Sequence, residues 1–520
     1  MATRYDVLIR NGWIVDGTGR PGYPADLGIV GEVIAALGAI PLEAQADCIV
    51  DASGLVVAPG FIDIHTHADI ALLHAPEHLP KVMQGVTTEV FTNCGLGFAP
   101  VTDEAMQTQR RYLGGLFGPD AGVTWEWRCV ADFLDALAQR RPACNVVYLI
   151  PHGAVRVSVM GMEDRPATPD EIDRMEAMVA QGMEEGAWGL STGLWYAPMR
   201  AASREEVVRL CRRAGFFATH QRDYGDALFA ATEESLAIAQ EAGVPVQISH
   251  LQMNGPQMAG RASELLGLLE QARSRGVDVT CDTYPYTAGS TLVQALLPAW
   301  AVAGGPGGIL RQLADPEARE RIARALDARN VNWAQYVLIG AQSAQNAACE
   351  GQSFAEAAQR RGLTVGQWVC ALLEEEELRA CFVHHAAHEE NVRTILQWPG
   401  QMVGSDGLHL HGKTHPRLYG TFARILGRYV REERVLTLEQ AVHKMTGLPA
   451  ARLGLSRRGT LAVGNAADIV LFDPETVRDT ATFEDPLRFP VGIPCVWVNG
   501  QAAKWADAPT GARNGRVLRR

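Results

Sequence analysis

Hydrophobic and polar residues alternate differently at the two ends of the chain and in its middle. Residues 5–51 form short alternating stretches separated by glycines, and residues 467–473 and 495–500 repeat that texture. Such stretches predict β-strands joined by turns. Because the termini of a domain often lie close together, we expect both ends, 1–58 and 455–520, to build one small β domain.

The middle of the chain alternates apolar strand-like stretches with amphipathic helical ones. Clear helical periodicity is found at residues 169–185, 204–213, 226–242 and 263–275. The predicted strands lie at 60–65, 88–93, 145–151, 188–192, 215–220, 245–250, 277–283 and 401–406. This alternation is typical of a parallel α/β fold, and eight repeats predict a (β/α)8 TIM barrel at 59–454. A doubly wound open sheet is the alternative, although no glycine-rich dinucleotide-binding motif supports it.

The segment between the seventh and eighth predicted strands is too long for one crossover. It covers about 287–399 and holds helical stretches at 309–328 and 353–359. Long insertions of this kind often cover active sites, so we expect it to lie over the mouth of the barrel.

Composition and net charge argue against several classes of protein. Of 520 residues, 47% are apolar, which supports a large core, and the net charge of −12 argues against nucleic acid and anionic membrane surfaces as partners. We see no signal peptide or membrane span, and ten cysteines without paired spacings argue against a disulfide framework. The sequence therefore predicts a cytoplasmic protein with a small-molecule substrate, and a homo-oligomer stays open.

Metal-binding residue types stand at the ends of five predicted strands. They are His65, His67, Cys94, His220, His250 and Asp406. Side chains at the carboxyl ends of barrel strands converge on one mouth, and strand alternation puts the first two histidines on one side. Nitrogen, sulfur and oxygen donors together are typical of zinc. Each residue alone is explained by core packing or a turn, but five strand ends together predict a metal site.

Two further histidine clusters have ordinary explanations. We interpret His384, His385 and His388, inside the insertion, as surface or capping residues. A second cluster directly follows Asp406, and whether it lines the pocket is left open; it comprises His409, His411 and His415.

The donor set predicts hydrolysis. Zinc lowers the pKa of bound water to about 7 and polarises a carbonyl group. Asp406 is placed to take the proton from that water and pass it to the leaving nitrogen. An amide nitrogen leaves poorly unless it is protonated, so one carboxylate serves both halves of the reaction.

The layout resembles the amidohydrolase superfamily. The resemblance rests on Gly-Phe-Ile-Asp-Ile-His-Thr-His at 60–67, single histidines ending strands five and six, and an aspartate ending strand eight. The segment 459–473 is also typical of that superfamily, where it belongs to a β-sandwich formed by both termini. The match covers nearly the whole chain and implies the same two-domain architecture here.

Many members of the superfamily bridge two metals with a carboxylated lysine on strand four, and this chain has no lysine near Thr192. A cysteine at the position of Cys94, on strand two, is typical of the D-aminoacylase branch, the N-acyl-D-amino-acid deacylases. The segments 189–198, 283–286 and 415–420 also resemble that branch. The resemblance implies one tight zinc and a second, weaker or empty site. The tight site would use Cys94, His220 and His250; the second would use His65, His67 and Cys94. The resemblance also implies that Asp406 is the acid and base.

Substrate contacts follow from the same resemblance. Arg417 would hold the substrate α-carboxylate, because its guanidinium pairs with a carboxylate through two hydrogen bonds, with help from Tyr286 and Ser290. Tyr196 would donate to the scissile carbonyl. Gln252 occupies a position where the family usually has a lysine. Because glutamine is neutral, we expect it to bind the substrate carboxylate more weakly than a lysine would.

The sequence thus predicts a zinc-dependent hydrolase that cleaves the amide bond of N-acyl-D-amino acids. Two alternatives remain. One is a related amidase acting on D-residue dipeptides or on cyclic or xenobiotic amides, and the other is a non-catalytic scaffold that kept the fold. A scaffold usually loses metal ligands, whereas here the ligands and Asp406 are all present.

Overall fold

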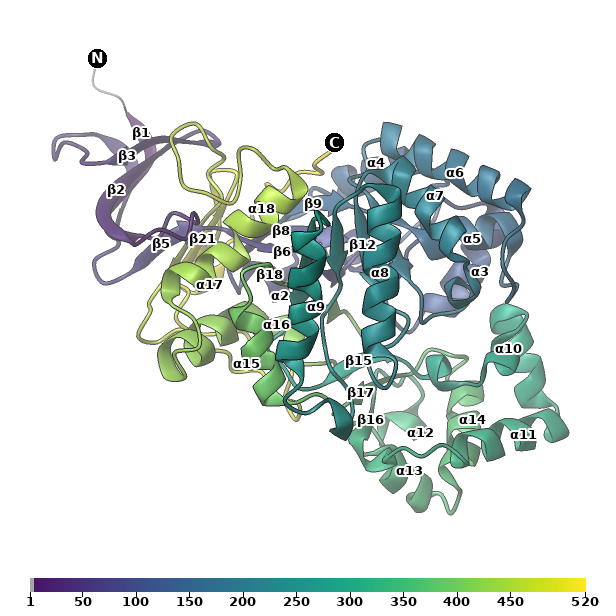
Figure 1. Ribbon diagram of the computed structural model, residues 1–520. Helices are drawn as coiled ribbons and strands as arrows, with labels where there is room; N and C mark the ends of the chain where they lie inside the picture. Colours follow the sequence, from purple (N-terminus) through teal and green to yellow (C-terminus); the bar gives the residue numbers. More distant parts are fainter. Residues whose placement is uncertain (1–3) are drawn as a thin grey trace.

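The computed structural model describes residues 4–520, so the first three residues of the predicted range 1–58 lie outside the described part. The chain forms a mixed α/β structure (Figure 1). Within residues 4–520, no helix is both long and apolar enough to cross a membrane.

Parallel strands form the centre of the molecule. In chain order they are β6 (Phe61–Asp63), β8 (Val86–Phe91), β9 (Asn145–Tyr148), β10 (Ile150–Pro151), β11 (Leu190–Gly193), β12 (Phe217–His220), β13 (Val246–Ile248), β14 (Val279–Thr283) and β18 (Gln401–Val403). Neighbours pair in parallel as β6-β8-β9 and as β10-β11-β12-β13-β14-β18. The short strands β7 (Thr66–His67) and β19 (Gly407–Leu408), just beyond the first and last of these, also pair in parallel. The first and last strands are therefore neighbours at their carboxyl ends.

The strands are short and fully buried, as expected for parallel strands covered on both faces. Helices separate them along the chain. They are α1 (Ala71–His74), α2 (Leu79–Val82), α3 (Asp103–Leu113), α4 (Val130–Arg140), α5 (His152–Met160), α6 (Pro169–Glu184), α7 (Arg204–Ala214), α8 (Leu228–Ala242) and α9 (Ala262–Ser274).

Local capping explains where two of these helices begin. The Thr168 hydroxyl accepts from the Glu171 backbone N–H, and the Glu171 carboxylate accepts from the Thr168 backbone N–H, which fixes the start of α6. Ser203 accepts from the backbone of Glu206 at the start of α7, and Gly215 ends that helix with a φ of 71°.

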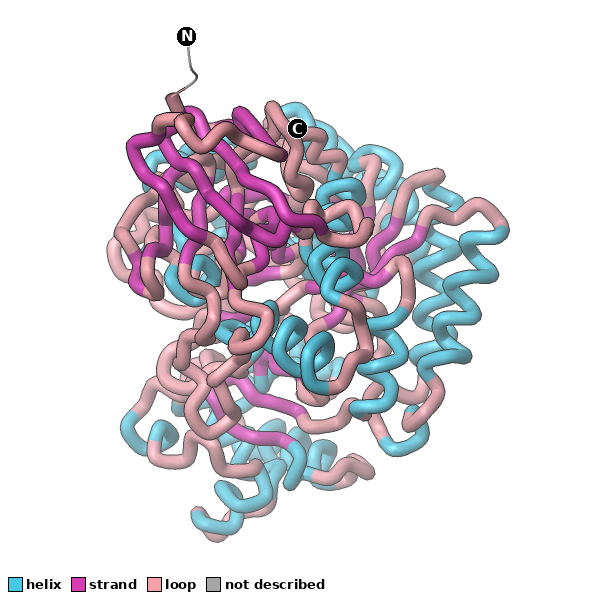
Figure 2. The backbone as a smooth tube through the Cα atoms, turned by 90° about the vertical axis from the view of Figure 1, so that its left-hand side faces the viewer, coloured by secondary structure: helices cyan, strands magenta, loops and turns pink. Residues whose placement is uncertain are grey.

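Both ends of the chain build one nine-stranded sheet. Its strands are β1 (Tyr5–Ile14), β2 (Tyr23–Val30), β3 (Val33–Gly38), β4 (Ala46–Asp51), β5 (Val56–Pro59), β20 (Ile469–Phe472), β21 (Cys495–Val498), β22 (Gln501–Trp505) and β23 (Ala508–Pro509). The N-terminal and C-terminal strands join where β5 pairs antiparallel with β20. Figure 2 shows this sheet near both termini, to one side of the helices.

The segment between β14 and β18 contains a small structure of its own. Strands β15 (Gly289–Leu292), β17 (Cys381–His384) and β16 (Tyr336–Ile339) form an antiparallel sheet, and six helices lie between or after these strands along the chain. The helices are α10 (Gly305–Ala314), α11 (Pro316–Asp327), α12 (Ala344–Ala347), α13 (Phe354–Arg360), α14 (Val365–Glu375) and α15 (Glu389–Gln397). The stretch 309–328, expected as one helix, is divided, because Asp315 caps a second helix that begins at Pro316.

Four helical segments follow the last parallel strand. They are α16 (Arg417–Arg424), the π-helical stretch Ile425–Glu432, α17 (Leu438–Met445) and α18 (Gly447–Leu453). The helix α17 contacts both β18 and β6, so it packs across the place where the first and last parallel strands meet.

Candidate metal centre

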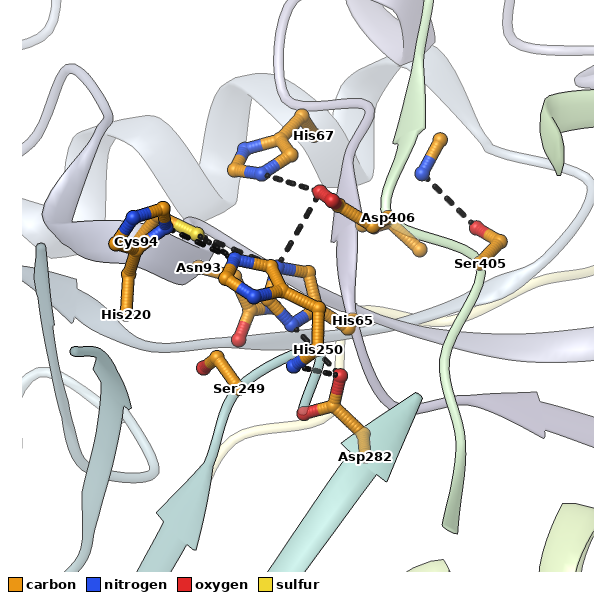
Figure 3. A network of polar contacts seen from close by, with 12 residues as sticks. His65, His67, Asn93, Cys94, His220, Ser249, His250, Asp282, Ser405 and Asp406 are labelled. Atoms are coloured by element: carbon orange, nitrogen blue, oxygen red, sulfur yellow. Dashed lines mark hydrogen bonds and ion pairs between the residues drawn. The ribbon is translucent and has the colours of Figure 1, made fainter. Parts of the chain in front are cut away.

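The predicted metal-binding residues meet at the carboxyl ends of the parallel strands (Figure 3). All six side chains belong to residues no more than 8% exposed: His65, His67, Cys94, His220, His250 and Asp406. They come from five different strands, so the fold and not local sequence brings them together.

One group of donors surrounds the Cys94 thiol. Its Sγ lies 3.4 Å from Nε2 of His65 and 3.3 Å from Nε2 of His250. Nδ1 of His220 lies 2.9 Å from the same His250 nitrogen. The donor atoms of His65, Cys94 and His250 all lie within 4.8 Å of one another.

A second group includes the carboxylate. Oδ1 of Asp406 lies 3.1 Å from Nε2 of His67 and 3.5 Å from Nε2 of His65. These three donors also lie within 4.8 Å of one another. Because His65 belongs to both groups, the two form one continuous cluster.

Three residues of the cluster have left-handed backbone conformations. The φ angles of Cys94, His250 and Asp406 are 58°, 33° and 50°. Non-glycine residues adopt this region at an energetic cost of about 1–2 kcal/mol each, and such residues gather at functional sites. Each of them follows the end of a strand, where the change of direction turns its side chain towards the cluster.

The electrostatics of the donors suit a divalent metal ion. Burial lowers the pKa of His250 to about 4 and lowers the pKa of His220 well below its usual value, so both imidazoles are neutral with free lone pairs. Burial also raises the pKa of the Cys94 thiol to about 11. A thiolate there needs a nearby cation, which a bound metal supplies. The soft sulfur, the neutral nitrogens and the carboxylate oxygen match the donor chemistry of zinc.

Asp282 at the end of β14 orients the cluster and was not expected from the sequence. Its Oδ1 lies 3.1 Å from Nδ1 of His65 and accepts the backbone N–H of His250 at 2.7 Å. Gln247 donates to its other oxygen at 2.6 Å. Carboxylates behind metal-binding histidines fix the ring orientation. The available signal was an aspartate inside a strand predicted to be buried, Val-Thr-Cys-Asp-Thr.

Arg417 lies against Asp406, beside the cluster. It is fully buried, its Nη2 is 2.9 Å from Oδ2 of Asp406, and its guanidinium lies 4.6 Å from the Tyr284 ring centre. Burial opposes ionisation of Asp406, but Arg417 and the nearby histidines lower its pKa well below the usual value. The Nε and Nη1 groups of Arg417 are buried and have no hydrogen-bond partner within residues 4–520.

A cavity of about 280 Å³ opens onto the cluster. Its wall includes the predicted substrate residues Tyr196, Gln252 and Ser290, but neither Arg417 nor Tyr286. The Tyr286 ring packs against His415, and its hydroxyl has no partner in the described residues.

Of the two tyrosines that follow β14, Tyr284 is on the cavity wall and Tyr286, the one singled out from the sequence, is not. Both follow β14 in the stretch Thr-Tyr-Pro-Tyr, where Pro285 ends the strand and makes alternation an unreliable guide to direction.

Of the three predicted substrate residues on the wall, two already have hydrogen-bond partners in the protein. The Tyr196 hydroxyl lies 2.9 Å from Oγ1 of Thr291, and its ring lies 4.8 Å from that of His220. The Gln252 amide donates to Oγ1 of Thr283 at 3.1 Å. The Ser290 hydroxyl has no partner within residues 4–520.

The other histidine clusters separate in the structure. His384 is half-buried, lines the cavity and stacks on Tyr336 with ring centres 4.1 Å apart, in place of the surface or capping role expected from the sequence. His409 stacks on His78, and His415 donates to the carbonyl of Ala288 at 2.9 Å. Neither of these two, nor His411, is on the cavity wall.

Comparison with known proteins gives consistent matches over the full length. The model of the amidohydrolase family matches residues 49–503. A D-aminoacylase of Alcaligenes xylosoxydans xylosoxydans is 39% identical, with 99% of this chain and 98% of that protein covered.

Two solved structures are similarly close. One is a D-aminoacylase with a binuclear metal centre, in which one metal activates and the second attenuates. It has a TM-score of 0.84 and 36% identity, over 99% of this chain and 100% of that one. The other is an N-acyl-D-glutamate deacylase from Bordetella bronchiseptica, complexed with zinc and a phosphonate mimic of the tetrahedral intermediate. It has a TM-score of 0.84 and 35% identity over 100% of both chains.

Proposed function

The chain belongs to the amidohydrolase family, in its D-aminoacylase branch, and on that premise we propose that it is a zinc-dependent hydrolase of N-acyl-D-amino acids. It cleaves the amide bond to give a carboxylate and a free D-amino acid. The observation that carries the proposal is the position of Asp406, whose Oδ1 lies 3.1 Å from His67 in a buried Cys–His cluster that faces a cavity.

The metal ligands follow from the cluster and the family. Cys94, His220 and His250 hold the tighter zinc, and His65, His67 and Cys94 form a second, weaker site. Nε2 of His250 lies 3.3 Å from Sγ of Cys94 and 2.9 Å from Nδ1 of His220, which supports the first trio. The group of donors within 4.8 Å of one another that contains the sulfur has His65 in place of His220. When bound, zinc polarises the scissile carbonyl and lowers the pKa of a water molecule to about 7.

Asp406 moves the proton. Its Oδ1 faces His65 and His67, on the side of the donors, whereas Oδ2 pairs with Arg417. The low pKa keeps the carboxylate ionised and ready to accept a proton from the attacking water at Oδ1. The same oxygen then protonates the amide nitrogen as the C–N bond breaks. Tyr196 donates a hydrogen bond to the carbonyl oxygen as negative charge develops there.

Arg417 and Ser290 hold the α-carboxylate of the substrate. The two partnerless N–H groups of Arg417 and the free Ser290 hydroxyl supply donors for it, while Nη2 stays on Asp406. Tyr284, which lies on the cavity wall, takes the hydrogen-bonding role first assigned to Tyr286. Gln252 adds a neutral contact where a lysine would add charge.

The finer architecture belongs to the same proposal. We propose that residues 59–454 are a (β/α)8 barrel, that 1–58 and 455–520 form a β-sandwich domain, and that 287–399 is an insertion over the barrel mouth. The parallel pairing of β7 with β19 and the joining of both chain ends in one sheet support this division. The cytoplasmic location and the oligomeric state stay predictions.

A substrate panel with metal removal tests the function. We expect hydrolysis of N-acetyl-D-amino acids, little turnover of the L-enantiomers or of D-residue dipeptides, loss of activity on chelation, and recovery with zinc. Activity on dipeptides alone would favour the related amidase, and a chain without zinc or activity would favour the scaffold.

A further inference from the structure

We propose that Lys81 and Ser405 form a clamp that positions Asp406 for proton transfer. Both are positioning residues: they act through the backbone on either side of Asp406 and do not touch the substrate. The inference rests on the proposed function for its kinetic consequence, whereas its structural consequence stands without it.

Lys81 is fully buried, which is rare for a lysine unless its charge is paired. Its Nζ donates to Oδ2 of Asp63 at 2.6 Å and to Oγ of Ser405 at 2.6 Å, and lies 3.2 Å from Oε1 of Glu89. The three partners come from β6, β8 and the turn after β18. One ammonium group therefore ties the first, second and last parallel strands together directly behind the metal centre.

Ser405 carries this connection to the neighbours of Asp406. Its backbone N–H donates to Oδ1 of Asp63 at 2.8 Å, and its hydroxyl accepts both the Lys81 ammonium and the backbone N–H of Gly407 at 3.1 Å. The residues before and after Asp406 are therefore fixed by one hydroxyl. In Figure 3, Ser405 lies next to Asp406 and carries its own polar contact.

Asp406 itself needs such support. Its φ of 50° lies in the left-handed region, which an L-residue keeps only when the surroundings impose it. Its backbone N–H donates to the carbonyl of His65 at 2.8 Å, which connects the turn to the strand that carries His65 and His67. Without the clamp, the turn is free to relax and carry the carboxylate away from His67.

The space around Gly407 is consistent with the clamp. A Cβ at this position would lie 3.1 Å from both Nζ of Lys81 and Oγ of Ser405, and 2.9 Å from a methyl carbon of Leu418. A side chain here would therefore press on the ammonium and the hydroxyl.

Ser249 provides an internal comparison. It precedes His250 as Ser405 precedes Asp406, both serines are fully buried, and both are followed by a residue with positive φ. The Ser249 hydroxyl, however, has no partner in the described residues, whereas that of Ser405 bonds two groups. A buried serine after a strand is therefore not enough to form the clamp.

The test compares Ser405→Ala with Ser249→Ala, because each removes one buried hydroxyl and leaves the Lys81–Asp63–Glu89 charges intact. We expect Ser405→Ala to lower kcat by on the order of tenfold or more at similar KM and zinc content, since small misplacements of catalytic groups have large effects. Ser249→Ala should stay within about twofold of wild type, as expected when no positioned group is disturbed. Lys81→Met should match Ser405→Ala in kcat if it folds.

Two measurements separate positioning from general stability. In an Asp406→Asn background, Ser405→Ala should lower kcat no further, because the group it positions is already disabled. Crystal structures of wild type and Ser405→Ala should show the Asp406 carboxylate displaced from His67 in the variant. The inference is overturned if the two alanine variants have equal kcat, if the defect persists undiminished beside Asp406→Asn, or if Asp406 keeps its place in the crystal. The crystal comparison decides the matter even if the proposed substrate is wrong.

Discussion

The guanidinium of Arg417 lies 2.9 Å from Oδ2 of Asp406, and both groups are buried. The pairing gives the two carboxylate oxygens different surroundings, because Oδ1 faces His65 and His67. One oxygen is held by the Arg417 cation, while the other lies among the metal-binding histidines, on the side where the proposed proton transfer takes place. This asymmetry suits a carboxylate that must accept a proton and then release it within one turnover.

Asp406→Asn should remove proton transfer and leave the metal site in place. The amide is nearly the same size but cannot accept the proton, so we expect kcat to fall by about 10²- to 10⁴-fold, the usual contribution of general acid–base catalysis. Zinc content, measured by mass spectrometry, should be unchanged. Near-normal turnover with full zinc would exclude Asp406 as the acid and base.

Arg417→Lys separates the two tasks assigned to this residue. A lysine keeps the positive charge but lacks the planar guanidinium group, which can bond Asp406 and the substrate carboxylate at the same time. We expect kcat/KM to fall by roughly 10- to 100-fold, the loss of one or two charge-assisted hydrogen bonds, mainly through KM. If KM were unchanged and only kcat fell, Arg417 would serve Asp406 alone and another group would hold the substrate anion.

Cys94→Ser should remove the metal. Neutral serine oxygen is a poor ligand for zinc compared with thiolate, so we expect metal affinity to fall by at least roughly tenfold. Cys211→Ser is the matched control, since Cys211 is also fully buried but lies in α7. Equilibrium dialysis against zinc should show a defect in the first variant only. Equal zinc binding by both would mean that Cys94 is not a ligand.

The strand periodicity predicts most of the candidate metal centre because a parallel strand constrains its last residues strongly. His220 ends β12, and His65, His250 and Asp406 follow strands whose boundaries are close to those expected. The substrate wall was harder to predict, because Tyr284 and Tyr286 lie beyond β14 and Pro285 interrupts the alternation. The sequence did not indicate a role for Lys81, because its partners Glu89 and Ser405 lie close to it only after distant strands have paired.

Gln252→Lys should strengthen substrate binding. Gln252 lies on the cavity wall, 5% exposed, and supplies a neutral amide where the family usually has a lysine. A cation there would add a charge-assisted bond, roughly twice as strong as a neutral one, so KM for an N-acetyl-D-amino acid should fall by about threefold to tenfold. Gln252→Met is the control and should raise KM. A lysine variant with unchanged or higher KM would show that the substrate carboxylate lies elsewhere.

Arg329 is the one arginine or lysine on the cavity wall within residues 4–520, and it comes from the segment between β14 and β18. Its Nη1 donates to the carbonyl of Leu296 at 2.9 Å, which leaves the rest of the guanidinium available to a ligand. We expect this cation to favour a substrate with an acidic side chain. N-Acetyl-D-glutamate and N-acetyl-D-glutamine test this directly, because they have nearly the same shape and differ in charge.

Wild-type kcat/KM should favour the glutamate substrate by about tenfold, a modest ratio because Arg329 is exposed and screened by solvent. Arg329→Met should bring the ratio close to one by losing activity on glutamate alone. Arg321→Met is the control, since the Arg321 guanidinium lies 3.9 Å from the Trp300 ring centre and off the cavity wall. Added salt should reduce the wild-type ratio but not that of Arg329→Met, because only a charge contact is screened. A wild type that prefers glutamine, or a ratio that survives Arg329→Met, would mean that the cavity does not select side chains through this cation.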